Sequence, residues 1–547
     1  MAAPGAEPEN EPGAEPGDGS GAGPVPETIY GLLRRGARRW PERELVVFDG
    51  ARGWTWSDAL DEAASAADVL RSAGVGAGDR VIILLPNGAA WLRAWWGATL
   101  LGAVVAPVNP AYRGRMLADV CDRIGPAAVV ADRATAERLE GAHRELVVDP
   151  DRLSEGRRPE GRRSVEELEA APQPWDPHCL LLTSGTTGPS KASITTNAAL
   201  CHFAEWLVDS CAVGPDDVFQ ADMPWFHLSA FGPVVQMMRV GGRFAVRAAP
   251  AMTSYWATAR ESGATFAVAP GTVAQFLESR PADTGDRDHA MRFVVCSPLP
   301  SDPDRFVERF GLAGLCTAYG STEASIPLIQ ALDTPTRLDS CGKQRPGFTV
   351  RLVDEHDREV ATGEIGELIV RSDRPWLLSQ GYLGDPAATV RAWRNGWFHT
   401  GDALWADADG YLHFHDRYKD VLRRRGENIS SFEVERDVAA YPGIAEVACV
   451  ASPGEFGGDD EVKVFVVAEP GAEVDHGHLV EFLCERMAHF MVPRYVEVVD
   501  ELPKTPSLRV RKHLLRERGH SRATWDRERA GYHLTREGLE RTGGLEA

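Results

Sequence analysis

Closely paired cysteines are missing from this sequence. Its nine cysteines are scattered along 547 residues without any C-x-x-C spacing, which argues against a zinc site and against a disulfide framework. We therefore interpret them as reduced thiols of a cytoplasmic protein. Basic residues are also in deficit, because 59 Lys and Arg stand against 80 Asp and Glu and leave a net charge of -21. Bulk electrostatic attraction to nucleic acid or to an anionic membrane is disfavoured.

A long uninterrupted hydrophobic run is missing as well. The stretch at residues 89–108, AAWLRAWWGATLLGAVVAPV, comes nearest to the length of a membrane span. Arg93 interrupts it, Gly97 weakens it and Pro107 ends it. We predict a buried helix that runs into a strand at this place.

The first 27 residues contain no aromatic side chain and consist mainly of Pro, Gly, Ala and acidic residues. Such a segment cannot bury enough apolar surface to offset the entropy of ordering, so we expect a disordered acidic tail at 1–27. The segment also lacks the basic start and the apolar middle of a signal peptide.

Helical and strand patterns alternate from about residue 28 onward. The helical stretch LDEAASAADVLRSAG is followed by the short apolar strand DRVIILLP, and the same alternation continues past residue 300. It is typical of a parallel sheet with helices on both faces. After residue 340 strands and turns dominate, which indicates a β-rich subdomain, and a compact stretch of about 100 residues follows it.

We therefore expect an α/β protein. Its large N-terminal domain of doubly wound sheets plus the β-rich subdomain is predicted at 28–418, and a small mobile α+β domain at 419–520. A C-terminal extension is predicted at 521–547.

A loop rich in Gly, Ser and Thr follows the apolar run at 179–182. Gly185 and Gly188 allow backbone N–H groups to turn inward, and Lys191 adds a positive charge, which together suit a phosphate. The spacing G-x-x-G-x-x-K differs from the Walker pattern, so a P-loop NTPase is disfavoured. The alternative is a flexible surface connection.

Five separated stretches share their order and spacing with one enzyme superfamily. They are TSGTTGPSK at 183–191, PWFHLSA at 224–230, YGSTEAS at 319–325, GWFHTGDALWADADGYL at 396–412 and DRYKDVLRRRGENISSFEVE at 416–435. In these stretches the chain resembles the AMP-forming acyl-adenylate superfamily of acyl-CoA synthetases, luciferases and peptide-synthetase adenylation domains. The likeness covers roughly residues 28 to 520, and it is nearest to carnitine- and short-acid-activating CoA ligases.

The resemblance implies that the loop holds the β- and γ-phosphates of ATP while a carboxylate attacks the α-phosphorus. The residues expected there are Thr183, Ser184, Gly185, Thr186, Thr187, Gly188 and Lys191. Thr322 would bond a phosphate oxygen, and Glu323 would ligate a magnesium ion that bridges phosphates. The structural alternative for Glu323 is an acid in a first helical turn, stabilised by the helix dipole.

The resemblance also implies a site for the nucleoside. Tyr319 would stack on adenine, and Asp402 would accept hydrogen bonds from both ribose hydroxyls with Arg417 nearby. The same site is expected to include Ser297, Pro298, Gly320 and Ser321. A core aromatic is the alternative for Tyr319, and a plain turn residue is the alternative for Asp402.

Three further positions match a gate, a hinge and a thiol channel in the superfamily. His227 would separate the adenylate from the acyl pocket, although a buried histidine of the core is the alternative. Lys419 matches the hinge about which the small domain turns between two half-reactions. Gly426 matches a position where a missing side chain leaves room for the pantetheine arm of CoA.

The sequence departs from the superfamily pattern near its end. In PKTPSLRVRK, Leu508 and Arg509 stand where Gly and a catalytic Lys are expected. Arginine keeps the charge but is bulkier and planar, so it does not replace lysine directly at a close contact. Arg509 is our candidate for this role, and Lys512 or Lys504 are the alternatives.

A second departure concerns the acyl pocket. Val295 and Cys296 stand where two glycines are common, and their added volume is expected to shrink or reshape the pocket. A short or aromatic acid is therefore favoured over a long fatty chain. Leu228 stands where amino-acid-activating relatives keep an Asp, so an α-amino acid is disfavoured.

We therefore predict an ATP- and magnesium-dependent ligase that activates a small or aromatic carboxylic acid as an acyl-adenylate. Pyrophosphate release and transfer to a thiol would follow, with CoA as the expected acceptor. One alternative is a nitrite-dependent diazotisation of an aromatic amine in a natural-product pathway, which Arg509 would suit. Another is a degenerate member that binds nucleotide without catalysis. The sequence does not determine the oligomeric state, and it is compatible with a dimer.

Overall fold

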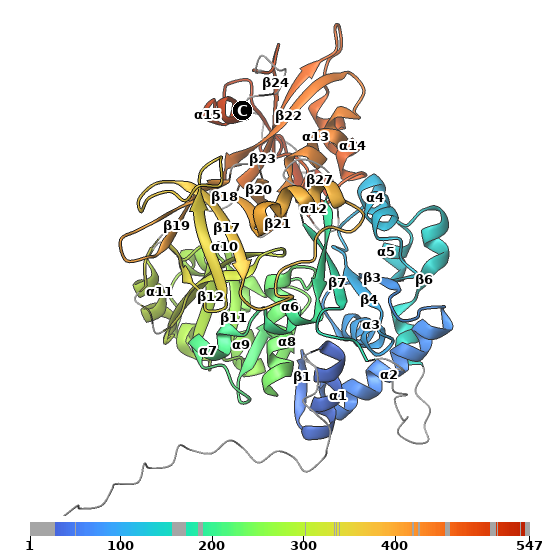
Figure 1. Cartoon of the computed structure of the whole chain (residues 1–547). Coiled ribbons are helices and arrows are strands. Elements are labelled where there is room, and N and C mark those ends of the chain that lie inside the picture. Colours follow the sequence, from blue (N-terminus) through green and yellow to red (C-terminus); the bar gives the residue numbers. More distant parts are fainter. Residues whose placement is uncertain are drawn as a thin grey trace, which may run out of the picture.

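The chain forms a large N-terminal domain with a smaller C-terminal domain above it (Figure 1). The computed structural model describes residues 28–49, 51–155, 171–183, 190–300, 302–332, 334, 336–338, 340–417, 421–424, 427–454, 460–503, 510, 512–535 and 538–541. The tail expected at 1–27 lies outside these residues, as does most of the expected phosphate loop.

A six-stranded sheet forms one half of the large domain, in the order β6-β5-β3-β4-β7-β8. Its strands are β3 (Arg80–Leu84), β4 (Val104–Pro107), β5 (Ala128–Ala131), β6 (Val147–Val148), β7 (Pro177–Thr183) and β8 (Lys191–Thr196). Neighbouring strands are parallel except β7 and β8, which are antiparallel. The prediction of short buried strands in a parallel sheet is confirmed here.

A second sheet of thirteen strands runs β16-β17-β18-β19-β15-β14-β13-β12-β11-β9-β10-β1-β2. Its first strands along the chain are β1 (Glu44–Phe48), β2 (Ala51–Thr55), β9 (Val218–Ala221), β10 (Arg243–Val246), β11 (Phe266–Pro270), β12 (Phe293–Ser297) and β13 (Gly314–Ser321). From β1 through β10, β9, β11 and β12 to β13 the pairing is parallel.

Antiparallel pairing begins between β13 and β14 and continues through the rest of this sheet. The strands of this part are β14 (Ser325–Gln330), β15 (Ser340–Gln344), β16 (Phe348–Val353), β17 (Gly366–Ser372), β18 (Phe398–Ala406) and β19 (Leu412–Arg417). The expected β-rich subdomain is therefore the antiparallel end of a continuous sheet.

Helices cover both sheets of the large domain (Figure 1). They are α1 (Ile29–Arg39), α2 (Trp56–Ser72), α3 (Ala89–Leu100), α4 (Gly114–Ile124), α5 (Arg133–Ala136), α6 (Asn197–His202), α7 (Trp206–Cys211), α8 (Leu228–Val240), α9 (Tyr255–Ser262), α10 (Gly271–Ser279), α11 (Pro303–Phe310) and α12 (Pro386–Ala392). Short 3₁₀ segments lie at Gly141–Leu146, Pro150–Ser154, Met252–Ser254, Thr284–Arg287 and Arg394–Gly396.

The stretch at 89–108 is the predicted buried helix running into a strand. Helix α3 packs so closely on α2 that a Cβ added at Gly97 would lie 2.7 Å from the Cβ of Ala66. Arg93 is compatible with this burial because its guanidinium donates to the carboxylate of Glu62 at 2.6 Å. Among the described helices, none combines the length and the apolar character needed to cross a bilayer.

The C-terminal domain is built on a four-stranded sheet, β22-β23-β24-β25. The strands of this sheet are β22 (Ile444–Pro453), β23 (Asp460–Ala468), β24 (Tyr495–Val498) and β25 (Trp525–Asp526). The domain also contains two separate strand pairs, β20 (Val421–Arg424) with β21 (Glu427–Ser430), and β26 (Tyr532–Leu534) with β27 (Leu539–Arg541). The helices of the C-terminal domain are α13 (Ser431–Ala439), α14 (His476–Cys484) and α15 (Lys512–Glu517). Strand β25, from the stretch after residue 520, pairs with β24.

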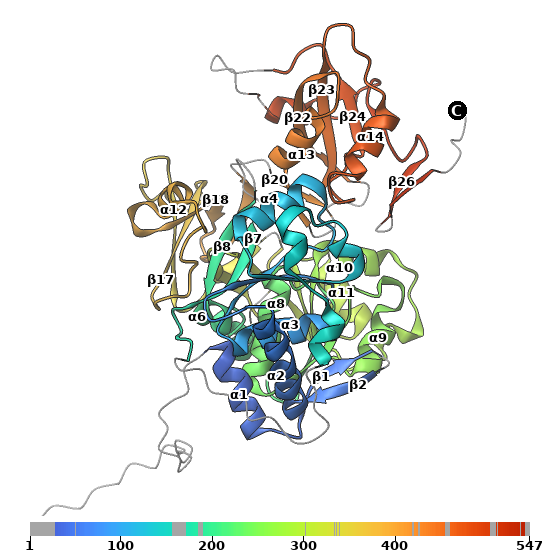
Figure 2. The ribbon, with the colours of Figure 1, turned by 90° about the vertical axis from the view of Figure 1, so that its right-hand side faces the viewer.

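Helix α4 of the large domain lies directly below α13 of the small domain (Figure 2). Arg436 of α13 donates to Asp119 of α4 at 2.8 Å, and Met116 of α4 belongs to the hydrophobic core of the small domain. The two domains are therefore joined by packing as well as by an ion pair, and they enclose the cavity described next.

Candidate active site

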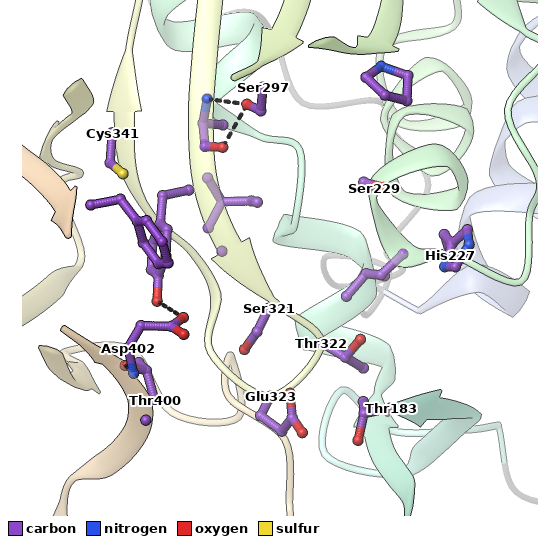
Figure 3. Close-up of a pocket in the computed structure, with 18 of the residues that line it drawn as sticks. Thr183, His227, Ser229, Ser297, Ser321, Thr322, Glu323, Cys341, Thr400 and Asp402 are labelled. Carbon is purple, nitrogen blue, oxygen red and sulfur yellow. Dashed lines mark hydrogen bonds between the residues drawn. The ribbon is translucent and has the colours of Figure 1, made fainter. Parts of the chain in front are cut away.

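A cavity of about 1690 Å³ lies between the antiparallel end of the large sheet, helix α8 and the small domain. Thr400 and Asp402 line one side of it, and His227 and Ser229 line the opposite side (Figure 3). Thr183, Thr322 and Glu323 lie between these two sides (Figure 3). Glu427 and Glu433 line it as well, so residues from all five sequence stretches meet in one place, although they are far apart in the chain.

The side of the cavity at Asp402 is polar. The hydroxyl of Tyr319, near the end of β13, donates to Asp402 Oδ2 at 2.6 Å, and the Asp402 backbone N–H donates to Thr400 Oγ1 at 3.1 Å. Asp402 is only 6% exposed, so these contacts fix its carboxylate. Across the β18–β19 pairing, Arg417 lies opposite Asp402, and its side chain lies outside the described structure. We call this region the nucleoside end.

Gly320 is explained by the tight turn that follows Tyr319. A Cβ at Gly320 would lie 2.1 Å from the carbonyl oxygen of Ser325, and Ser325 itself has a positive φ of 59°. Only a residue without a side chain allows the two backbone segments to approach so closely. The turn brings Thr322 and Glu323 into the cavity.

Glu323 is 8% exposed and faces the centre of the cavity. Its Oε1 accepts a hydrogen bond of 2.9 Å from the hydroxyl of Tyr382. Burial, together with the nearby carboxylate, raises the pKa of Tyr382 well above its ordinary value, so the phenol stays a donor. The ammonium of Lys191 lies 4.7 Å from the centre of the Tyr382 ring. Lys191, Tyr382 and Glu323 thus form one continuous group.

The expected phosphate loop connects β7 to β8, and only its two ends are described. Thr183 and Lys191 are cross-strand partners, so the loop closes a hairpin whose base opens into the cavity. Ser184, Gly185, Thr186, Thr187 and Gly188 lie outside the described residues. At the loop's far end, Ser190 donates to Glu433 Oε1 through its backbone N–H at 2.8 Å and through its hydroxyl at 2.5 Å.

Glu433 belongs to α13 of the small domain, so this contact joins the two domains. The Glu433 side chain is buried, with only 6% exposure, and burial raises its pKa while the two hydrogen bonds from Ser190 oppose that shift. The neighbouring hairpin β20–β21 makes a second contact across the cavity. His227 Nε2 donates to Glu427 Oε2 at 3.0 Å. The hairpin therefore faces the cavity beside the predicted gate.

The side of the cavity beyond His227 is predominantly apolar, with Ser229 and Ser297 among its polar lining residues, and we call it the acyl end. It is lined by residues of the α6–α7 corner, of α8 and its preceding loop, and of the ends of β11, β12 and β14. These include Phe203, Ala204, Trp206, Leu207, Met223, Phe226, Leu228, Ala230, Pro233, Val268, Pro270, Val295, Pro298 and Ile326. The described lining residues from these segments include no Asp, Glu, Lys or Arg.

The structure separates the two residues that replace the usual glycines. Val295 lines the cavity, whereas Cys296 points to the opposite face of β12, into the core formed by α9, α10 and α11. Side chains alternate across a strand, so only Val295 takes volume from the acyl end. Ser297 lines the cavity beside them and donates to the carbonyl of Ala318 at 2.9 Å (Figure 3).

The remaining predicted site residues are placed only in part. Pro298 and Ser321 line the cavity, while Lys419, Gly426, Lys504 and Arg509 lie outside the described residues. Lys512 is described, but its ammonium is held at 2.7 Å by Glu435 and by the Ser431 hydroxyl on the small domain. In this arrangement Lys512 therefore does not stand in for the expected lysine.

Three residues of the cavity were not identified from the sequence. Tyr382, Glu427 and Glu433 line it, yet none was assigned a role. Glu427 and Glu433 belong to the stretch that carried the resemblance, so their acidic character within it was the available signal. Tyr382 lies in SQGYLGD, which has no spacing or periodicity that indicates a site.

Comparison with known proteins agrees with this geometry. The profile of the AMP-binding enzyme family matches residues 33–383, and that of the AMP-binding enzyme C-terminal domain matches residues 433–509. The chain belongs to the AMP-binding enzyme family. This AMP-binding enzyme is an AMP-forming acid–thiol ligase that activates an acid as an adenylate and passes it to CoA. ATP and CoA are its substrates.

Two relatives cover nearly the whole AMP-binding enzyme. Crotonobetaine/carnitine–CoA ligase of Salmonella paratyphi B is 27% identical over 504 residues, which cover 87% of this chain and 96% of the relative. Feruloyl-CoA synthase of Amycolatopsis sp is 30% identical over 508 residues, which cover 89% of this chain and all of the relative. A solved structure of a double mutant of o-succinylbenzoate CoA synthetase from Bacillus subtilis has the same fold. Its TM-score is 0.78 at 22% identity, over 89% of this chain and 98% of that one.

These comparisons decide between the alternatives raised by the sequence. The predicted superfamily, fold class and ligase activity are confirmed, and the non-catalytic alternative is wrong. The nitrite-dependent alternative receives no support.

Proposed function

We propose that this ligase activates an aromatic or other compact carboxylic acid that carries no second charge. The observation that supports this proposal is the acyl end, where the described lining residues contributed by the α6–α8 corner and by β11 and β12 include no Asp, Glu, Lys or Arg. A second carboxylate or a quaternary ammonium would lose its hydration there without gaining a partner. An aromatic ring would instead bury apolar surface against side chains such as Phe203 and Trp206.

The nucleoside end supports the proposed position of ATP. Asp402 presents a fixed carboxylate that suits the two ribose hydroxyls, and the ring of Tyr319 beside it offers a face for adenine. Lys191 and the Thr322 hydroxyl line the path from there to the gate, where phosphate oxygens need donors. We propose the phosphate loop at 183–191 as the remaining part of this site.

We propose Glu323 as the magnesium ligand. Its carboxylate lies among the hydroxyls of Thr322 and Thr183 (Figure 3), and such a set of oxygen donors suits a hard divalent cation. Magnesium bound there would supply positive charge against the phosphates as pyrophosphate departs. Tyr382 holds the Glu323 carboxylate in place.

The domain arrangement supports a role for the small domain in thiol transfer. Hairpin β20–β21 lines the cavity through Glu427 and contacts the gate at His227. We propose that Lys419 is the hinge and that Gly426, which falls between these two strands in the sequence, lies beside the pantetheine arm. Adenylation would then need the other arrangement, in which we propose that Arg509 contacts the acid and the α-phosphate.

Pyrophosphate release tests the proposal. The protein is incubated with ATP and magnesium and with short, aromatic and medium-chain acids or nitrite, each with and without CoA. Release with an aromatic acid, together with AMP formation that rises when CoA is present, is the expected result. Turnover only with long-chain or dicarboxylic acids would refute the proposed acid class. Release with nitrite alone that is indifferent to CoA would refute the assignment of the acyl end as an acid site.

A further inference from the structure

A buried arginine lies behind the acyl end of the cavity. Arg345, between β15 and β16, is 4% exposed. Its guanidinium donates to three backbone carbonyls, those of Phe203 at 3.3 Å, Ile326 at 3.4 Å and His202 at 3.1 Å. The planar fork of an arginine can reach several acceptors at once, which an ammonium or an apolar side chain cannot do.

The carbonyls that Arg345 holds belong to different walls of the acyl end. Phe203 follows the last turn of α6, whereas Ile326 lies on β14, and both side chains line the cavity. Phe203 in turn packs on α8, because a Cβ added at Gly232 would lie 2.2 Å from Phe203 Cδ1. One guanidinium therefore connects the α6–α7 corner with β14 directly and with α8 through the Phe203 ring.

A charged cluster holds Arg345 in this position. Burial lowers the pKa of Arg345 to about 10, while the nearby Glu205 opposes that shift, so the guanidinium stays charged at neutral pH. Glu205 lies 3.7 Å from Arg345 and accepts from Arg239 at 2.9 Å and from Arg374 at 2.7 Å. The described cavity lining includes Phe203 and Ile326 but none of these charged side chains.

We infer that Arg345 is a positioning residue that sets the spacing between the walls of the acyl end, and thereby the width of the acid that the ligase accepts. This inference rests on the proposed function, because the acid is assigned to the acyl end by that proposal. Arg345 touches no substrate. It acts through the backbone of the residues that do, so its loss changes the shape of the pocket and leaves the nucleoside end unchanged.

The test compares Arg345→Met and Arg345→Lys with a matched control, Arg309→Met. Arg309 is likewise a largely buried arginine that donates to two carbonyls, those of Glu278 at 2.8 Å and Pro281 at 3.2 Å, and to Asp286 at 2.9 Å. None of these residues belongs to the described cavity lining. Acid-dependent pyrophosphate release is measured with benzoate, cinnamate and 2-naphthoate, together with the KM for ATP and the Tm of each variant.

Arg345→Met is expected to raise the KM for the preferred acid about tenfold, since hydrogen bonds from a charged group are lost. The ratio of kcat/KM between narrow and wide acids is expected to shift about tenfold toward the wide ones, while the KM for ATP stays unchanged. For Arg345→Lys, the KM for the acid and the kcat/KM ratio are expected to lie between those of the wild type and those of Arg345→Met, because lysine keeps the positive charge but lacks the planar fork of donors. Arg309→Met is expected to lower Tm with no change in the ratio.

An unchanged ratio in both Arg345 variants would overturn the inference, as would an equal shift in Arg309→Met or an equal rise in the KM for ATP. If Arg345→Met does not fold, Arg345→Lys decides by the same ratio. The wild-type protein is measured first. Absence of acid-dependent release in the wild type refutes the proposed function and the inference with it, whereas an active wild type with an unchanged ratio refutes the inference alone.

Discussion

The nucleoside end and the acyl end of the same cavity are built in different ways. At the nucleoside end, polar side chains face the cavity and hold one another directly, as Tyr319 holds Asp402. At the acyl end most of the side chains facing the cavity are apolar, and charged groups that hold their backbone lie behind the wall, as Arg345 does. If the proposed assignment of the two ends is right, the chemistry at the first end depends on which side chains are present. The selectivity at the second end then depends on where the backbone places the side chains.

This difference predicts where substitutions act. A change at the nucleoside end or at the centre of the cavity removes a contact to the substrate, so it lowers the rate or the affinity directly. A change behind the acyl end moves a wall, so it alters the ranking of acids. The predictions below test this distinction at four places.

The largest effect is expected at the centre of the cavity. Glu323→Gln removes the proposed magnesium ligand, and acid-dependent ATP–pyrophosphate exchange is expected to fall about a thousandfold. Tyr382→Phe removes only the hydrogen bond that holds the carboxylate, so a loss of about tenfold is expected. Equal losses in the two variants would show that the orientation of the carboxylate, and not its charge, is what matters.

The second effect is expected at the nucleoside end. Asp402→Ala should raise the KM for ATP about a hundredfold, because hydrogen bonds to a fixed carboxylate are lost. Tyr319→Phe, which keeps the ring and loses only the hydroxyl, serves as the control and should raise it far less. The ratio among acids should stay constant in both variants. A changed acid ratio would contradict the separation of the two ends.

The third effect is expected at the contact between the gate and the small domain. Glu427→Gln weakens the contact to His227, and we expect the CoA-dependent step to slow about tenfold. Pyrophosphate exchange, which precedes that step, should remain at the wild-type rate. Single-turnover measurement of thioester formation and of exchange separates the two. Glu469→Gln, an exposed change on the same domain, is the control, and a slowed exchange in Glu427→Gln would contradict the assignment.

The smallest effect on catalysis is expected at Asp222, which lies next to the lining residue Met223. Asp222 is 1% exposed, and burial raises its pKa from 3.8 to about 7, while a hydrogen bond from Gln220 opposes the shift. The folded state therefore favours the protonated carboxyl. The stability that this provides is complete below pH 3.8 and is lost as the pH rises toward 7.

Asp222→Asn keeps a neutral group at this place at every pH. The variant should match the wild type in stability near pH 4 and exceed it increasingly up to pH 7, with a constant difference above that. Tm measured across this range checks the expectation, and pyrophosphate release at neutral pH should change little. A difference in Tm between the variant and the wild type that does not change with pH would show that Asp222 does not titrate in this range.

The sequence pointed to individual residues of the nucleoside end and to few of the contacts behind the acyl end, for a physical reason. Tyr319, Glu323 and Asp402 lie in short segments that carry the resemblance, so their roles could be proposed from it, and those roles stay predictions. Glu205 and Arg345 meet across 140 residues of chain, and nothing local marks them. Only the folded packing brings them behind the wall.

The fold was predictable to a similar extent. The helix and strand at 89–108 follow directly from their apolar pattern, and so do the short parallel strands. The pattern did not indicate that the β-rich part continues the large sheet edge to edge through β14, because strand pairing over long separations leaves no periodic signal. Tyr382 was likewise not predicted as a site residue, because it contacts Glu323 across 59 residues of chain.

The contact between Ser190 and Glu433 has a consequence for kinetic order. Ser190 adjoins the phosphate loop, and here its backbone N–H and hydroxyl are both occupied by a carboxylate of the small domain. An anion of high charge such as pyrophosphate and this carboxylate repel each other at close range. Pyrophosphate should therefore leave before the thiol enters, so we expect ping-pong kinetics, in which added pyrophosphate reverses the first half-reaction and thereby competes with CoA for the acyl-adenylate form of the enzyme.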